Sequence, residues 1–235
     1  FTMSKMEKRL LKLLDSRKHV WGFDTEKIPE QSLVNECLTK AWKVTPSKNN
    51  FMPYHVNVIG PGPENQILKD KIHGLSRLNK RRTNVRHNVN NIENYDEEGN
   101  NPNFLFYNTA PYILVFSQRV AEPNPYIANA IIEQNDIYEQ MHASMFGNFQ
   151  TTAAVEIGMF MQNATAFLLE QGIDTTYIKC YPAELDAWKD FPFVEGPVML
   201  LAGLGYCKTS RRDGMSEADK KIDYKPEPEE IIRFR

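Results

Sequence analysis

The chain has 235 residues and a formal net charge of -2, and 41% of its residues are hydrophobic. This length suffices for one domain with a single core, and the near-neutral charge gives no indication of a nucleic-acid partner. The longest apolar run, Pro197 to Tyr206, is too short to cross a bilayer. The 3 cysteines lie far apart, which favours free thiols in a reducing cytoplasm and forms no metal-binding pattern.

The N-terminal half of the chain combines helical and extended patterns. In chain order, these patterns predict a helix ending near Ser16, an extended piece at Val20–Phe23, a helix opened by Pro29, a strand leaving Tyr54, and a helix from Glu64 to about Asn79. The stretch from about 80 to 103 begins with three basic residues and is then rich in asparagine. We expect it to form a polar excursion from the domain.

The C-terminal half contains the strongest core signals. The expected elements are a buried strand at Pro111–Ser117, a helix at about 125–145, an apolar helix at Thr151–Gln171, and strands at Thr175–Lys179 and Val198–Tyr206. From about residue 208 the chain is polar, which indicates a C-terminal extension. Residues 1–235 are therefore expected to form a single domain with these two additions.

Polar residues interrupt the apolar helix at four positions, which are Glu156, Gln162, Asn163 and Thr165. Buried polar groups need hydrogen-bond partners. We expect all four to be satisfied within the core or at an interface.

Helices and strands alternate without the regular order of a parallel sheet. No G-x-G-x-x-G follows a strand, and no Walker-type loop is present. The sequence therefore argues against a Rossmann or P-loop enzyme.

Two segments carry polar groups that suit a ligand. The turn from Thr45 to Pro53 places Pro46, Ser47 and Asn50 between a helix and a strand, where a hydroxyl, an amide and backbone N–H groups can meet a planar ligand. An ordinary helix-to-strand loop is the alternative. The cluster Arg17-Lys18-His19 suits a phosphate, because arginine offers a fork of donors and lysine a point charge. The alternative is a basic cluster at the end of a helix.

The turn resembles a known signature. Pro46-Ser47-x-x-Asn50-x-x-Pro53-Tyr54 is similar to the Pro-Ser-x-x-Asn-x-Gln-Pro-Trp motif of the FMN-dependent nitroreductase family, with Met52 in place of Gln and Tyr54 in place of Trp.

The same family carries an Arg-Arg-Ser-x-Arg run that holds the FMN phosphate and ribityl chain. Arg17 and Lys18 match its first two basic residues, whereas His19 replaces Ser and Trp21 replaces the last basic residue.

Further matches follow in family order. Asn103 precedes Ala110-Pro111 at the spacing of an asparagine that contacts the pyrimidine edge of the flavin. The run from Gln162-Asn163 to Gly172 and Asp174 matches the buried helix and strand that approach the flavin. The resemblance implies flavin-binding roles for four consecutive residues, Tyr177, Ile178, Lys179 and Cys180. Of these, Tyr177 and Ile178 would cover one flavin face, and the N–H of Lys179 or Cys180 would reach the ring nitrogen that takes the hydride.

Relatives also supply a basic residue from the C-terminal tail to the phosphate. Lys225 is the first candidate for this role, and Lys221 is the second. No residue is expected to act as a catalytic acid or base, because the flavin carries the chemistry.

The resemblance implies an α+β, three-layer nitroreductase-like fold, with a central, mostly antiparallel sheet wrapped by helices. It further implies an intertwined homodimer with two flavins at its interface and a C-terminal strand that crosses to the partner. The apolar positions Ile231, Ile232 and Phe234 suit such docking.

The implied function is FMN-dependent oxidoreduction by a ping-pong mechanism. NAD(P)H is the implied hydride donor, and a nitroaromatic, a quinone or a similar small molecule is the acceptor. Two alternatives remain open, namely another flavin chemistry on the same fold, such as reductive dehalogenation or flavin fragmentation, and a degenerate relative without enzymatic activity.

Overall fold

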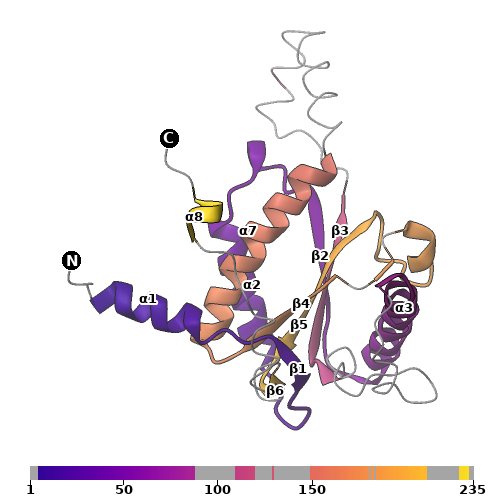
Figure 1. Cartoon of the computed structure of the whole chain (residues 1–235), viewed down its shortest axis with the longest axis horizontal. Helices are drawn as coiled ribbons and strands as arrows, with labels where there is room; N and C mark the ends of the chain where they lie inside the picture. The colour runs from indigo at the N-terminus through magenta and orange to yellow at the C-terminus, as the bar shows by residue number, and fades with distance from the viewer. Residues whose placement is uncertain are drawn as a thin grey trace.

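The computed structural model describes residues 5–87, 109–119, 129, 149–179, 181–182, 184–210 and 228–232 (Figure 1). Its helices are α1 (Lys5–Asp15), α2 (Gln31–Val44), α3 (Pro63–His87), α7 (Phe149–Glu170), α8 (Pro228–Ile231) and the short 3-10 helices η1 (Lys48–Asn50) and η3 (Leu185–Trp188). Its strands are β1 (Val20–Phe23), β2 (Tyr54–Ile59), β3 (Tyr112–Gln118), β4 (Asp174–Ile178), β5 (Val198–Gly205) and β6 (Cys207–Ser210).

A four-stranded sheet forms the centre of the fold, in the order β2-β3-β5-β4 with antiparallel neighbours throughout. A second, two-stranded sheet pairs β1 with β6 antiparallel. In β3, successive residues point to opposite faces, so Ile113 and Val115 pack on one side and Leu114 and Phe116 on the other. Both faces of the main sheet are therefore apolar and need cover.

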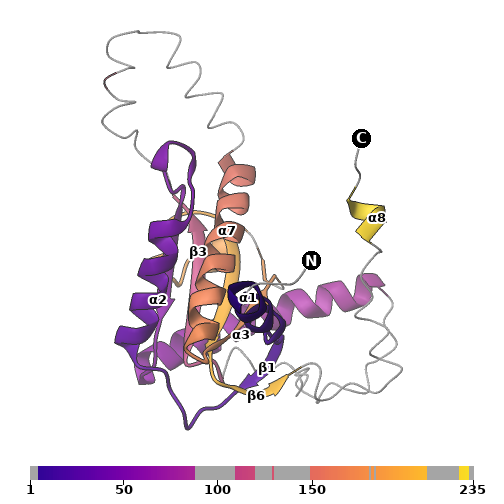
Figure 2. The same cartoon turned by 90° about the vertical axis from the view of Figure 1, so that its left-hand side faces the viewer.

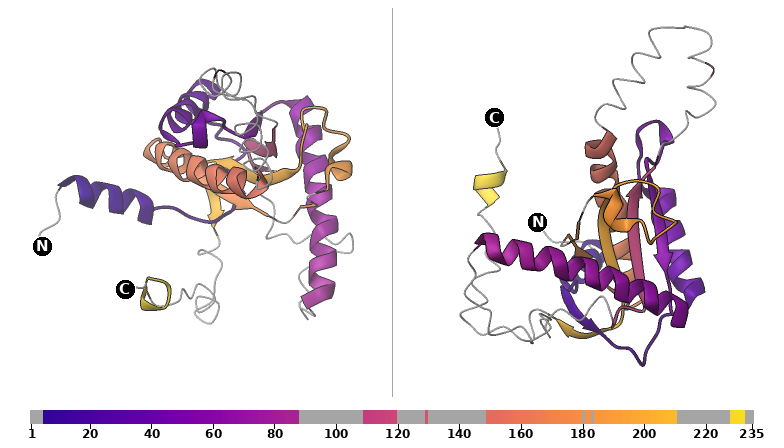
Figure 3. Two further views of the ribbon diagram at one scale, coloured as in Figure 1. Left: turned by 90° about the horizontal axis from the view of Figure 1, so that it is seen from above. Right: turned by 90° about the vertical axis from the view of Figure 1, so that its right-hand side faces the viewer.

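Helices supply that cover on both sides, which gives three layers (Figures 2 and 3). On one face, α2 presents Val34, Cys37, Leu38 and Ala41 at helical spacing and packs beside α7. On the other face, α3 contributes Ile72, and the segment from Tyr181 to Val194 adds an aromatic group around Trp188. The expected α+β fold with a central antiparallel sheet wrapped by helices is confirmed.

The small sheet closes one end of the structure. Phe23 of β1 is buried against β5, where a Cβ on Gly203 or Gly205 would lie 3.0 Å or 2.9 Å from its ring. These glycines therefore allow the aromatic ring to reach the backbone of the central strand.

The elements differ from the sequence-based expectation in two places, at the end of α3 and at strand β6. Helix α3 continues to His87, beyond the end expected near Asn79. No proline interrupts it, and Lys80, Arg81 and Arg82 are good helix formers. The rest of the expected excursion lies outside the described residues, as does nearly all of the helix expected at about 125–145. Strand β6 was not predicted from the sequence.

Helix α7 confirms the apolar helix expected at Thr151–Gln171, but the rest of the chain does not cover it on every side. One stripe remains exposed in the single chain, at Thr151, Ala154, Val155, Gly158 and Gln162. Val155 alone has 57% of its surface exposed. Positions with this spacing lie on one helix face, so α7 presents a largely apolar face that this chain alone leaves open.

Lys69 of α3 is the most deeply buried ammonium among the described residues. Only 2% of its surface is exposed, and its Nζ donates a hydrogen bond to the Pro111 carbonyl at 2.7 Å. Burial lowers the pKa of Lys69 from its ordinary 10.5 to about 8, against a smaller opposing effect of Asp70. In the unfolded chain the Lys69 ammonium stays protonated up to about pH 10.5, and burial in the folded protein disfavours this charged form.

We expect this lysine to make stability depend on alkaline pH. Because its folded-state pKa lies below its unfolded value, the penalty is complete below pH 8 and disappears as the pH rises to 10.5. The free energy of unfolding of the wild type, relative to Lys69→Met, should rise across this window by up to about 3 kcal/mol. Urea unfolding at a series of pH values measures this difference. The exposed Lys71, replaced in the same way, is the control, and an identical slope for both variants would contradict the assignment.

Candidate functional site

The N-terminal basic cluster lies beside the edge strand β4. Helix α1 ends at Asp15, and the next residue, Ser16, donates its hydroxyl to the Leu13 carbonyl at 2.6 Å. Arg17 and Lys18 follow and are exposed. The ring of His19 turns inward, with its Nδ1 3.4 Å from the Thr176 hydroxyl of β4. The structure thus places two free-standing cations next to the edge of the main sheet.

Asp174, at the start of β4, interacts electrostatically with Lys18 of this cluster. Burial raises the pKa of its carboxyl, whereas the Cys207 N–H, 3.1 Å from Oδ2, and the charge of Lys18 lower that pKa. Asp174 therefore joins β4, β6 and the basic cluster into one unit.

The residues predicted on β4 have different surroundings. Ile178 is 3% exposed and belongs to the core on the α3 side. The Tyr177 hydroxyl faces α7, 2.5 Å from the Thr165 hydroxyl. Lys179 is exposed, but its Nζ donates to the Met199 carbonyl at 2.6 Å and lies 5.5 Å from the centre of the Tyr181 ring. Because the side chains of Tyr177 and Ile178 point into the fold, only the backbone groups of β4 remain for a ligand along this edge. The flavin contacts predicted for these residues remain predictions.

The turn with Pro46, Ser47 and Asn50 is held by an internal network. The Ser47 hydroxyl accepts the Met52 N–H at 2.8 Å, and the Asn50 N–H donates to the Ser47 carbonyl at 3.1 Å. Asn50 and Met52 both have positive φ angles, of 57° and 45°. Asparagine tolerates this left-handed region, whereas methionine rarely adopts it. The turn is therefore a defined, partly strained structure rather than an open loop.

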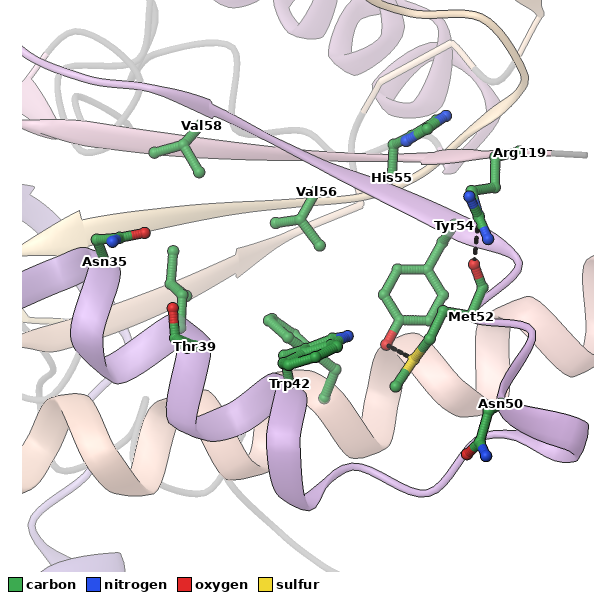
Figure 4. Close-up of a pocket in the computed structure, with 12 residues that line it drawn as sticks. Asn35, Thr39, Trp42, Asn50, Met52, Tyr54, His55, Val56, Val58 and Arg119 are labelled. Atoms are coloured by element: carbon green, nitrogen blue, oxygen red, sulfur yellow. Dashed lines mark hydrogen bonds between the residues drawn. The ribbon is translucent and has the colours of Figure 1, made fainter. Parts of the chain in front are cut away.

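Arg119 holds this strained turn in place and was missed by the sequence analysis. Its Nε and Nη2 donate to the carbonyls of Met52 and Phe51 at 2.7 and 2.8 Å (Figure 4). The guanidinium fork thus satisfies two backbone acceptors at the entrance to β2. No local motif marks an arginine that follows a different strand.

Helix α7 supports the turn from beneath. Glu156 is 3% exposed, and its Oε1 accepts the Lys48 N–H at 2.9 Å. Asn163 donates to the Thr45 hydroxyl at 3.0 Å. A cavity of about 420 Å³ lies between the turn and the helix. Its lining residues are Pro46, Ser47, Lys48, Thr151, Thr152, Val155, Glu156 and Met159.

A second cavity, of about 560 Å³, lies between α2 and β2 on the outer side of the same turn (Figure 4). It includes Asn50 and Met52, and the exposed Trp42 stands at its rim. The turn therefore separates two hollows, one on each side.

The basic cluster and the turn lie toward opposite ends of helix α7 in the same chain (Figures 1 and 2). The turn is bound to Glu156 near the start of α7, whereas α1 reaches Glu170 at its end through an ion pair with Arg9. At 1.5 Å per residue, these two anchors are about 21 Å apart along the helix axis. The structure therefore groups Arg17, Lys18 and His19 with β4, and Pro46, Ser47 and Asn50 with the start of α7.

Four predicted site residues lie outside the described part of the chain, namely Asn103, Cys180, Lys221 and Lys225. Among the residues that the structure does describe, no group of three or more His, Cys, Asp or Glu side chains could hold a metal ion. Within the same residues, no helix is long and apolar enough to cross a membrane.

Comparison with known proteins gives matches in structure only, because no protein-family model and no curated protein sequence matches the chain. A nitroreductase-like protein from Streptococcus mutans has a TM-score of 0.58 at 17% identity, over 94% of this chain and 100% of its own. A nitroreductase with bound FMN from Desulfitobacterium hafniense has a TM-score of 0.58 at 16% identity, over 92% and 98%. A BluB-like flavoprotein from Clostridium difficile has a TM-score of 0.58 at 16% identity, over 100% of both chains. This chain therefore has the nitroreductase-like fold.

Proposed function

We propose that this protein is an FMN-dependent oxidoreductase that takes a hydride from NAD(P)H and passes electrons to a nitroaromatic, a quinone or a similar acceptor. The observation that carries the proposal is the Pro46–Asn50 turn, which borders a cavity on a nitroreductase-like fold. The D. hafniense protein of this fold binds FMN. Bound FMN would supply the redox chemistry by a ping-pong mechanism, while the protein holds, orients and shields it.

The described residues fit such a cofactor at both of its ends. Arg17 and Lys18 are exposed cations suited to a phosphate. The turn offers a hydroxyl and an amide beside a cavity, and the buried Glu156 Oε2 has no partner in the chain. At 3.3 Å per strand residue, Lys179 lies about 10 Å beyond the point where His19 meets β4.

The separation of the two groups supports a site built by two copies of the chain. Within one chain the two groups are anchored near opposite ends of α7, whereas the partner's turn can approach the basic cluster across a two-fold axis. The open stripe on α7 and the exposed Leu10 and Leu11 of α1 provide apolar surface for such a contact. Ile231 and Ile232, 69% and 58% exposed, provide more. We infer a homodimer with two composite sites.

The proposed setting is the cytoplasm. Cys37 is buried and is a free thiol. A reducing compartment keeps thiols in this state.

The absorption spectrum of freshly purified protein tests the function. Flavin bands, with FMN rather than FAD released by heat at about one per subunit, are the expected result. Reduction by NADH or NADPH and reoxidation by a panel of nitroaromatics and quinones then identify the two substrates. Colourless protein that fails to bind added FMN at micromolar concentration would contradict the proposal.

Arg17 provides a second test, directed at the phosphate. Arg17→Ala should weaken FMN binding by about 1.5–3 kcal/mol, because a charge-assisted hydrogen bond to the phosphate is lost. Riboflavin lacks the phosphate, so its affinity should change less. Titration of apoprotein with both flavins measures the difference, with Lys12→Ala on α1 as the matched control. Equal losses for the two flavins would remove Arg17 from the phosphate.

A further inference from the structure

Glu156 has an unmet hydrogen-bonding requirement at the cavity under the turn. Its Oε1 accepts the Lys48 N–H, whereas its Oε2 is buried and has no partner. The cavity that Glu156 borders is lined by apolar residues such as Val155 and Met159 and by the polar residues Ser47 and Lys48. The pKa of the nearby Tyr54 phenol is raised, first by burial and then by the charge of Glu156.

The three other polar residues that the sequence singles out inside α7 contrast with Glu156. Asn163 donates to Thr45, and Thr165 lies within hydrogen-bond distance of the Thr175 and Tyr177 hydroxyls. Gln162 is exposed. Supporting the turn needs only one of the two carboxylate oxygens, so structural support leaves the second one unexplained. A buried carboxylate oxygen without a donor is destabilising.

The missing donor can come from a ligand in the cavity. The terminal torsion of a glutamate rotates over a broad range, so the unmet oxygen can turn to the cavity that Glu156 borders. An ionised carboxylate only accepts hydrogen bonds. It therefore suits a neutral donor and repels a phosphate.

We propose that Glu156 accepts a hydrogen bond from the uncharged part of FMN, either a ribityl hydroxyl or the ring N3–H. This proposal rests on the proposed function. It also assigns a direction to the cofactor, because the anionic phosphate is attracted to Arg17 and Lys18 and repelled from the Glu156 end. The negative charge of Glu156 further opposes the extra charge of the reduced flavin.

Glu156→Gln tests the proposal, because glutamine keeps the shape and one oxygen to accept the Lys48 N–H. An amide N–H then faces the ligand donor, so oxidised FMN should bind about 5–10-fold more weakly. Reduced FMN should bind about as tightly as before, because the removal of a repulsive charge offsets the lost hydrogen bond. Its affinity relative to that of oxidised FMN should rise about tenfold, which is about 30 mV of midpoint potential for a two-electron couple.

The design includes a control and two discriminating ligands. Glu195→Gln removes an exposed carboxylate that contacts His55, and it should leave affinity and potential unchanged. Lumiflavin keeps the N3–H but lacks the ribityl hydroxyls. Loss of the Glu156→Gln effect with lumiflavin assigns the bond to the ribityl chain, whereas its persistence assigns the bond to the ring. Should Glu156→Gln fail to fold, Glu156→Asp keeps the charge, withdraws the oxygens, and should weaken FMN binding while the potential stays low.

The outcomes separate this inference from the function itself. Wild type that binds FMN, with unchanged affinity and potential in Glu156→Gln, would show that Glu156 only supports the turn. Wild type that binds no flavin overturns both proposals.

Discussion

Mixing two variants that each fail to bind FMN should restore binding to about one quarter of the sites, if each site draws on two chains. Arg17→Glu reverses a charge of the basic cluster, and Ser47→Phe places a bulky ring at the cavity under the turn. In either homodimer both sites carry one defect. In a mixed dimer one site collects both defects and the other is intact.

The measurement is FMN bound per subunit after co-refolding or co-expression of the two variants. Mixing either variant with itself is the control and should recover nothing. If both groups acted within one chain, every site of a mixed dimer would still carry a defect. No recovery in a sample shown to contain mixed dimers would therefore disprove the composite site.

Gly196→Ala should be the most destabilising single methyl group in the described fold. A Cβ at Gly196 would lie 2.3 Å from the carbonyl oxygen of Gln118 and 3.1 Å from its carbonyl carbon. Both atoms are backbone at the end of β3, where Gln118 donates to the Pro197 carbonyl at 3.0 Å. The clash can be relieved only by separating β3 from β5, so we expect a loss of about 3 kcal/mol or more.

Gly74→Ala is the matched control. Gly74 lies inside α3, and a Cβ there would meet nothing within 4 Å. Alanine is more favourable than glycine inside a helix, so the free energy of unfolding of this variant should rise by up to about 1 kcal/mol. Urea unfolding of both variants reports the contrast. Similar stabilities for the two would contradict the close approach at Gly196.

The elements that the sequence predicts best are those with a strong local pattern. The alternation after Tyr54 and the apolar run after Pro111 suffice to predict β2 and β3. Strand β6 has no such pattern, because it is short and is stabilised by β1 from the other end of the chain. Apolar residues such as Ala154 and Val155 indicate burial but do not reveal whether the same chain or a partner supplies the cover.

The candidate site was predictable in its parts but not in its arrangement. Motif spacing suffices to single out Arg17, Ser47 and Asn50. Their separation along α7 depends on tertiary structure, which no spacing reveals. Glu156 is visible in the sequence as a polar residue in an apolar helix, yet its unpaired oxygen emerges only when the partners of all its atoms are known.

The pairing of β1 with β6 has a consequence for synthesis on the ribosome. Val20 is made first, and its partner Ser210 follows about 190 residues later. At bacterial to eukaryotic elongation rates, the first strand waits on the order of ten to forty seconds for the second. Strand β4 also has no neighbour until β5 follows it, and Phe23 cannot be covered before Gly203 and Gly205 emerge. The nascent chain therefore completes its core only after β5 and β6 have been made, and ribosomes that stall before β5 would release a chain with unpaired strands.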